Sequence, residues 1–180
     1  GANTVMLLNS LAMFGVFFYV SLYMQQVLGF SPVKAGLMFL PMTVMIIMVA
    51  PRAGHLADRT GPRLLVGVGQ LLVAGALILF AQLTAQSTAW ALVPPMMISG
   101  AGMAMTMTPA TAAAMGSVQP DKMGVGSAVL NSARQVGGSI GIALMGAVVA
   151  ARLSASLAQG QAGPAAFVHG IQCGFYLAAA

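Results

Sequence analysis

The sequence predicts an all-α transmembrane protein folded as a helical bundle, and three observations support this fold class. Hydrophobic residues make up 59% of the 180 residues and charged residues only 5%, whereas soluble domains average roughly 45–50% apolar and about 25% charged residues. The mean hydropathy is +0.92. The apolar residues also form long runs, close to the roughly 20 residues that a helix needs to cross a bilayer. These features exclude an ordinary soluble domain.

The apolar runs define the helices that we expect to span the membrane. Five runs are long enough for complete spans, at 5–28, 33–55, 64–83, 90–115 and 123–151. A sixth begins near residue 165 and stops at residue 180 on "FYLAAA", so we expect an incomplete last helix. We therefore expect a fragment of a longer protein, in which residues 1–180 form one transmembrane bundle.

Short turns with helix-start signals separate the runs. Ser31 and Pro32 form a turn followed by a helix start. Pro62 lies just inside the next helix, where its missing N–H costs nothing. Pro120 repeats this pattern and places Asp121 in a first turn, where the helix dipole favours an anion. None of these connections looks like a linker between soluble domains.

The few charges lie where topology signals are expected. Seven Lys and Arg residues against two Asp and Glu residues give a net charge of +5. The basic residues occur singly at the ends of apolar runs, not in a patch that would bind nucleic acid. If the turns alternate sides, one face carries Arg52, Arg59, Arg63 and Lys122, and the other carries Lys34 and Arg152. Positive residues accumulate on the cytoplasmic side, so we expect loop 57–63 to be cytoplasmic.

One turn, "GHLADRTGPR" at 54–63, concentrates charge in a chain that has little of it. Glycine there permits close approach of helices, and Asp58 can lie at the N-terminus of a neighbouring helix. The arginines can anchor at the membrane surface. A loop that only sets topology is the alternative interpretation.

This turn resembles the GxLaDrxGr signature that joins the second and third helices of each half of the major facilitator superfamily. The matching residues are Gly54, Leu56, Ala57, Asp58, Arg59, Gly61 and Arg63. Pro62 departs from the family, which often has a basic residue there. The resemblance implies two helical bundles that rock around a central site. It implies a conformational-switch loop formed by Gly54, Asp58, Arg59, Gly61 and Arg63.

The fifth run carries a polar stripe and a close-packing pair. A spacing of three to four residues puts five residues on one helix face: Ser127, Asn131, Arg134, Gln135 and Gly138. Gly137 and Gly141 form a GxxxG pair suited to helix packing. Arg134 lies about 11 residues into the run, where a cation costs at least ~2.5–3.5 kcal/mol without a partner or water. We therefore expect the stripe to face the protein interior or a wet cavity.

Three roles remain open for Arg134. It caps the carbonyls of a neighbouring helix or reaches the membrane surface, it contacts the substrate or the coupling ion, or it gates the cavity. Asn131 and Gln135 are candidates for the same cavity, because they share the stripe with Arg134.

The segment 124–149 is similar to the penultimate helix of the drug:proton antiporter branch with fourteen spans, which often shows an N-x-x-R-Q-x-G-G-x-x-G core. The matching residues are Asn131, Arg134, Gln135, Gly137, Gly138 and Gly141. The resemblance implies a C-terminal half fragment that supplies the last six of fourteen helices in a bacterial-type inner membrane. It implies that the missing N-terminal half carries the proton-binding acids, and that small hydrophobic substrates and protons are partners.

Two other runs offer candidate cavity walls. Gly100, Gly102 and Pro109 would let the methionine-rich fourth run bend. Its flexible methionines can adapt to ligands of several shapes, although packing between helices or against lipid is the competing interpretation. In the first run, Tyr19 and Tyr23 border either the mouth of a cavity or an interfacial aromatic belt.

Enzyme classes find little support in the sequence. There is no HExxH, GxSxG or GxxxxGK motif, and neither acid lies inside a predicted span. We therefore expect no enzymatic activity, no cofactor and no metal site. The family resemblance implies efflux of hydrophobic or cationic drugs by proton antiport with alternating access, and this is the predicted function. A family member that exports a single metabolite or peptide is one alternative, and an oligomeric six-helix channel or scaffold is another.

Overall fold

The computed structural model describes residues 2–84, 86–158 and 163–179, and within these ranges it contains helices and no strand. The main helices are α1 (Ala2–Leu22), α2 (Pro32–Leu37), α3 (Leu40–Thr60), α4 (Pro62–Phe80), α5 (Val93–Gly116), α6 (Met123–Ala158) and α7 (Gly163–Ala179). A π-helical turn, Tyr23–Val27, extends α1, and short 3₁₀ turns at Ala89–Leu92 and Pro120–Lys122 precede α5 and α6. The expected all-α transmembrane helical bundle is confirmed.

Four helical segments of the described chain are long and apolar enough to cross a membrane. They are Met6–Val27, Pro32–Thr60, Pro62–Phe80 and Pro120–Ser156. The apolar segment Ala166–Ala179 is shorter. α5 has 24 residues, but its Gly, Ser, Thr and Pro content keeps it below the hydropathy of those four. The division of residues 1–180 into five complete spans and one incomplete span remains a prediction.

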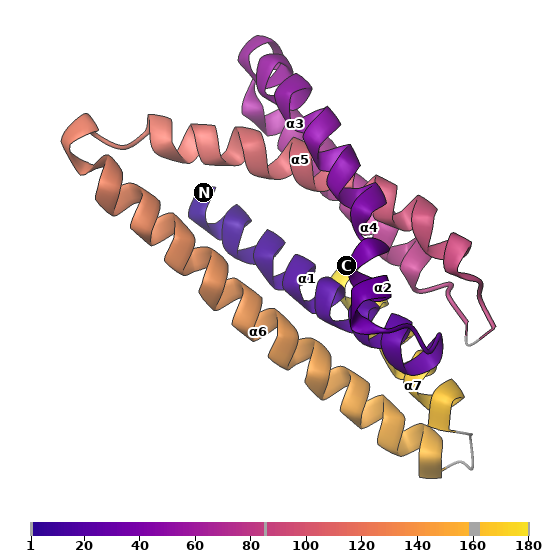
Figure 1. Ribbon diagram of the computed structural model, residues 1–180. Helices are drawn as coiled ribbons and strands as arrows, with labels where there is room; N and C mark the ends of the chain where they lie inside the picture. The colour runs from indigo at the N-terminus through magenta and orange to yellow at the C-terminus, as the bar shows by residue number, and fades with distance from the viewer. Residues whose placement is uncertain (1, 85, 159–162, 180) are drawn as a thin grey trace.

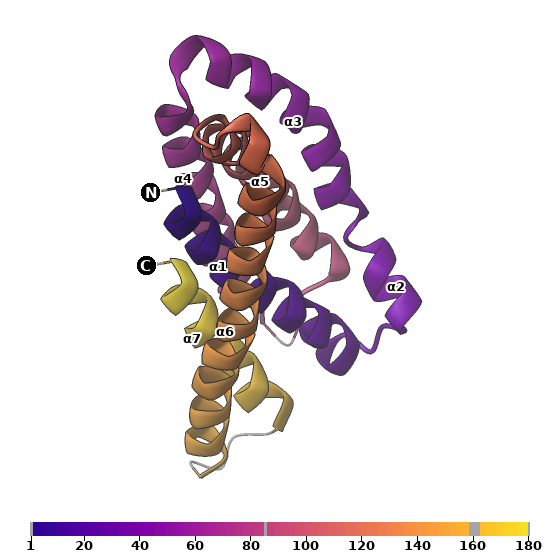
Figure 2. The same cartoon turned by 90° about the vertical axis from the view of Figure 1, so that its left-hand side faces the viewer.

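The helices form two groups, which meet mainly where α4 packs against α7 and α1 packs against α5 (Figure 1). In one group, α1 and α6 run side by side in the same direction, and α7 packs against α6. In the other, α4 packs antiparallel to α5, and α3 packs along α5 on its other side. Figure 2 shows α2 and α3 along the outer edge of the bundle, away from α7.

Two turns lie at the same end of the bundle, which we call the motif end (Figure 2). One is the turn between α3 and α4, and the other connects α5 to α6. The connection between α4 and α5 lies at the other end, which we call the opposite end (Figure 1).

The helix starts follow the local signals in the sequence. Ser31 caps α2, because its side-chain oxygen accepts a hydrogen bond from the Lys34 amide at 3.3 Å. Pro62 opens α4 as expected. Gly61 between α3 and α4 has φ 84° and ψ 150°, a conformation that is essentially limited to glycine.

The motif residues differ in one respect from the expected loop 57–63. α3 continues to Thr60, so Asp58 and Arg59 lie in its last turns, and Gly61 alone separates α3 from α4. The helix therefore continues past residue 55, where we expect the second span to end. The physical reason is that α3 accommodates both Pro51 and Gly54, and the chain leaves the helical conformation only at Gly61.

Close helix contacts depend on several of the predicted packing glycines. A Cβ atom at Gly137 would collide with the Leu7 carbonyl, and one at Gly141 would collide with the Leu11 carbonyl, so the GxxxG pair sets the approach of α6 to α1. Gly138 faces the Phe14 ring, where a Cβ would lie 2.8 Å from a ring carbon.

Gly100 and Gly102 act in the same way on α5. A Cβ atom at Gly100 would lie 2.5 Å from the Met42 carbonyl oxygen of α3, and one at Gly102 would lie 2.7 Å from the Gly69 carbonyl oxygen of α4. Pro109 is buried inside α5, which continues as one helix from Val93 to Gly116. The two glycines therefore let α5 pack between α3 and α4, and their role as hinges remains a prediction.

Candidate functional site

A groove of about 440 Å³ opens at the motif end between α3, α4 and α5. Its wall consists mainly of small side chains and includes Asp58: Gly54, Ala57, Asp58, Pro62, Thr108, Pro109, Ala112 and Ala113. Small side chains leave space between helices that larger side chains would fill. The groove is therefore a place where an additional segment or molecule can contact α3, α4 and α5.

The charged motif residues lie around this groove. Asp58, Arg59 and Arg63 are all exposed. Asp58 lines the groove, and Arg59 and Arg63 flank Gly61 at the turn that joins α3 to α4. The structure thus gathers the conformational-switch residues predicted from the sequence at one end of the bundle. Their role as a switch remains a prediction.

Arg134 forms a second polar centre, inside the bundle. This partly buried side chain leaves α6 and donates a hydrogen bond from Nη2 to the Thr111 hydroxyl of α5 at 2.8 Å. The same nitrogen lies 3.7 Å from the Met6 sulfur of α1. Arg134 therefore connects three helices, and its acceptor on α5 is a side-chain hydroxyl rather than the carbonyls of a neighbouring helix considered from the sequence.

Two buried polar atoms near this centre lack partners. Arg134 Nε and Asn9 Oδ1 make no hydrogen bond to any described residue. Asn9 is only 2% exposed and lies on α1 one turn after Met6, the residue that Arg134 contacts. Sequence reasoning missed Asn9 and Thr111, although an amide side chain within an apolar run was an available signal for Asn9.

The other polar side chains of the predicted stripe are more exposed than Arg134. Asn131 and Gln135 are exposed, as is Ser127, whereas Gly138 packs against Phe14. The predicted stripe is therefore divided: Arg134 turns toward α1 and α5, and the other polar side chains form an outer row. No carboxylate of this chain lies in that row, because the two acids, Asp58 and Asp121, are at helix ends.

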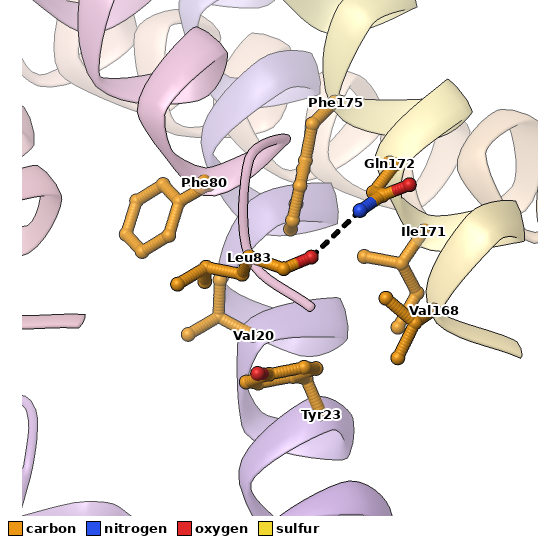
Figure 3. Close-up of a pocket in the computed structure, with 8 residues that line it drawn as sticks. All are labelled: Val20, Tyr23, Phe80, Leu83, Val168, Ile171, Gln172 and Phe175. Carbon is orange, nitrogen blue, oxygen red and sulfur yellow. Dashed lines mark hydrogen bonds between the residues drawn. The ribbon is translucent and has the colours of Figure 1, made fainter. Parts of the chain in front are cut away.

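Of the two predicted tyrosines, Tyr23 packs at the opposite end (Figure 3), and Tyr19 precedes it by four residues on α1. Tyr19 is 7% exposed and Tyr23 is 2% exposed. The Tyr23 hydroxyl donates to the Thr84 carbonyl at 2.6 Å, and Gln172 of α7 donates to the Leu83 carbonyl at 2.7 Å. These two bonds tie α1 and α7 to the chain that follows α4.

Little space remains around this contact. The void in Figure 3 has a volume of about 10 Å³, near the least volume that holds one water. Tyr23 therefore belongs to a tightly packed contact in this structure. Its proposed position at the mouth of a cavity stays a prediction.

No group of three or more His, Cys, Asp or Glu residues in the described ranges could hold a metal ion. Cys173, on α7, is free and partly exposed. Two places in the described part of the chain combine charged side chains with space or unpaired polar atoms: the groove at the motif end and the Arg134 centre.

Comparison with known proteins relates this chain to one family of transporters. The model of the Major Facilitator Superfamily matches residues 3–142. The whole chain aligns with the puromycin resistance protein pur8 of Streptomyces alboniger at 37% sequence identity. The aligned part makes up 37% of the length of pur8. A second alignment covers 84% of the chain and 28% of the tetracenomycin C resistance and export protein of Streptomyces glaucescens, at 36% sequence identity.

A third relative comes from another genus. This alignment covers 81% of the chain and 27% of the multidrug resistance protein Stp of Mycobacterium tuberculosis, at 34% sequence identity. The chain thus spans about a third of the length of these curated relatives.

Proposed function

This chain belongs to the major facilitator superfamily, and we propose that it is the C-terminal helical bundle of a drug efflux transporter. The chain is an integral membrane protein, because it belongs to this family and contains helices that are long and apolar enough to cross a membrane. Because it spans about a third of its relatives, an N-terminal half of the same transporter is its expected partner. We also propose that the full-length transporter crosses a bacterial inner membrane fourteen times.

The outer face of α6 is the observation that carries this proposal. Asn131 and Gln135 are exposed there, on either side of the inward-turned Arg134. Polar side chains on the surface of a membrane span are unfavourable against lipid and ordinarily face protein or a water-filled cavity. This face of α6 therefore fits a transport cavity between this bundle and the N-terminal half.

Drug transport is the specific activity that we assign to this cavity. Relatives of this chain carry names that refer to puromycin resistance, to multidrug resistance and to tetracenomycin C resistance and export. The partly buried methionines Met103, Met105 and Met107 of α5 supply flexible apolar surface, which suits hydrophobic or cationic drugs of different shapes. Membership of the major facilitator superfamily supports a transporter rather than an enzyme.

Alternating access is the proposed mechanism, with the motif end as its switch on the cytoplasmic side. The groove beside Asp58 is open, so a segment of the N-terminal half can enter it in one state and leave it in the other. Rocking of two bundles then exposes the cavity to each side of the membrane in turn.

Proton antiport would require a titratable group inside the membrane. The two acids of this chain, Asp58 and Asp121, are exposed at helix ends. We therefore assign the proton-binding acids to the N-terminal half, and we assign contacts with the drug and the cavity wall to Asn131, Arg134 and Gln135.

Inside-out membrane vesicles containing the full-length protein provide the test. A proton gradient should drive accumulation of puromycin or a fluorescent cationic dye, and an ionophore that collapses the gradient should abolish it. Vesicles from the same strain without the protein are the control. Equal accumulation in both preparations, for both compounds, would reject drug efflux. Accumulation that the ionophore does not affect would retain efflux and reject proton coupling.

A further inference from the structure

The Arg134 centre contains one unused hydrogen-bond donor and one unused acceptor. Arg134 Nε carries a proton that no described atom accepts, and Asn9 Oδ1 accepts no proton from any described donor. Each is buried, and an unsatisfied buried polar group is costly. The two atoms are complementary to each other, and they lie on the paired helices α6 and α1.

The contact of Arg134 with α1 suggests how the two groups could pair. The Arg134 guanidinium already reaches α1, where its Nη2 lies 3.7 Å from the Met6 sulfur. Asn9 follows Met6 by three residues, so its side chain lies on the next turn of the same face. An arginine side chain has several rotatable bonds, so a turn of the guanidinium away from Thr111 and along α1 is the movement that this pairing requires.

We propose that Asn9 is a positioning residue for Arg134, and that the guanidinium exchanges Thr111 on α5 for Asn9 on α1 during transport. In the state described here, Thr111 holds Arg134 and Asn9 is unpaired. In the other state, Asn9 accepts from Arg134 and the Thr111 hydroxyl is released. The exchange couples α1 to α5 through one side chain. This inference rests on the proposed transport function.

The first experiment tests whether Asn9 meets Arg134, and it does not depend on transport. Purified full-length protein is compared by thermal unfolding with Asn9→Asp, Arg134→Gln and the double variant. An aspartate at position 9 pairs with Arg134, so Asn9→Asp should leave the apparent Tm within about 2 °C of the unmodified protein or raise it. With Arg134→Gln the aspartate is buried without a partner, and the same substitution should lower Tm by about 5 °C or more.

A matched control separates this pairing from a general effect of a buried acid. Ser10 is also buried, at 4% exposure, but it is the next residue and points about 100° away around α1. Ser10→Asp should lower Tm with or without Arg134. Equal losses for Asn9→Asp in both backgrounds would overturn the proposed pairing.

The second experiment tests the exchange through the rate of transport. Asn9→Asp should hold Arg134 on α1 and lower drug turnover at least about tenfold, the effect of roughly 1.4 kcal/mol on a barrier, while Tm and KM change little. Thr111→Val should also lower turnover, whereas Thr111→Ser, which keeps the hydroxyl, should preserve it.

Normal turnover in a stable Asn9→Asp variant would overturn the exchange, even if the unfolding data establish the pair. If the unmodified protein transports no drug, the proposed function fails, and the unfolding comparison still decides whether Asn9 and Arg134 meet.

Discussion

The two ends of the bundle are built differently. At the opposite end, Tyr23 and Gln172 hold two consecutive backbone carbonyls, and the enclosed void is only about 10 Å³. At the motif end, small side chains leave a groove of about 440 Å³ beside exposed Asp58. One end is fastened across α1, α4 and α7, and the other leaves polar surface open. We infer that this bundle moves as a unit and exchanges contacts at its motif end.

Arg134 provides the largest expected effect, because it lies in the half of α6 nearer the motif end. Arg134→Ala should reduce efflux by the full-length protein at least about tenfold, since a hydrogen bond to a charged group contributes about 1.5–3 kcal/mol. Vesicle uptake at matched insertion levels measures this effect. Arg152→Ala, at an exposed position on the same helix, is the control and should retain transport. Unchanged efflux by Arg134→Ala would remove this residue from the mechanism.

The contact between α1 and α6, which runs between the two ends, should be sensitive to added volume. Gly141→Val puts a branched side chain against the Leu11 carbonyl, so we expect a loss of about 3 kcal/mol in unfolding free energy. Ala143→Val, at an exposed position two residues on, should cost much less. Thermal unfolding of both variants measures the difference, and similar Tm values would contradict the close α1–α6 approach.

The turn at the motif end should show a moderate effect. Gly61 has φ 84° and ψ 150°, so Gly61→Ala should cost about 1–3 kcal/mol of stability. Gly67 lies within α4 with open space around it. Gly67→Ala should therefore be neutral or gain about 0.5–1 kcal/mol. A Gly61→Ala variant as stable as Gly67→Ala would contradict the single-residue turn between α3 and α4.

The smallest effect is expected at the opposite end. Tyr23→Phe removes one buried hydrogen bond and leaves the Thr84 carbonyl without that donor, so stability should fall by about 1 kcal/mol. Tyr176 is 52% exposed, and Tyr176→Phe should change stability little. If the two variants unfold at the same temperature, the Tyr23 hydroxyl does not fasten this end.

Local features of the fold were predictable because their causes are local. Apolar run length gave the helices, and Pro62 and the Ser31–Pro32 pair marked two helix starts. The extension of α3 through Asp58 was missed because charge suggested a loop, whereas a helix end on the surface tolerates charge equally well. The π-helical turn Tyr23–Val27 had no recognised signal in the sequence.

The candidate site was predictable only in part. Arg134 could be singled out from the sequence, because a cation inside an apolar run is costly without a partner. Its partner Thr111 is 23 residues away and on another helix. Asn9 is 125 positions from Arg134 along the chain, so the proposed pairing depends on the packing of α1 on α6. Such contacts depend on the relative rotation of helices, which hydrophobic periodicity does not determine closely enough.

The reactivity of a cysteine in the groove tests most directly whether the motif end exchanges contacts during transport. In the full-length protein with its native cysteines replaced, including Cys173→Ser, Ala113→Cys would place a thiol on the exposed groove wall. Its labelling rate with a membrane-impermeant maleimide would be measured with and without transported drug. Thr88→Cys, in the exposed connection at the opposite end, is the control. We predict that drug changes the rate severalfold at position 113 and leaves it unchanged at position 88. Equal rates at position 113 in both conditions would contradict the account.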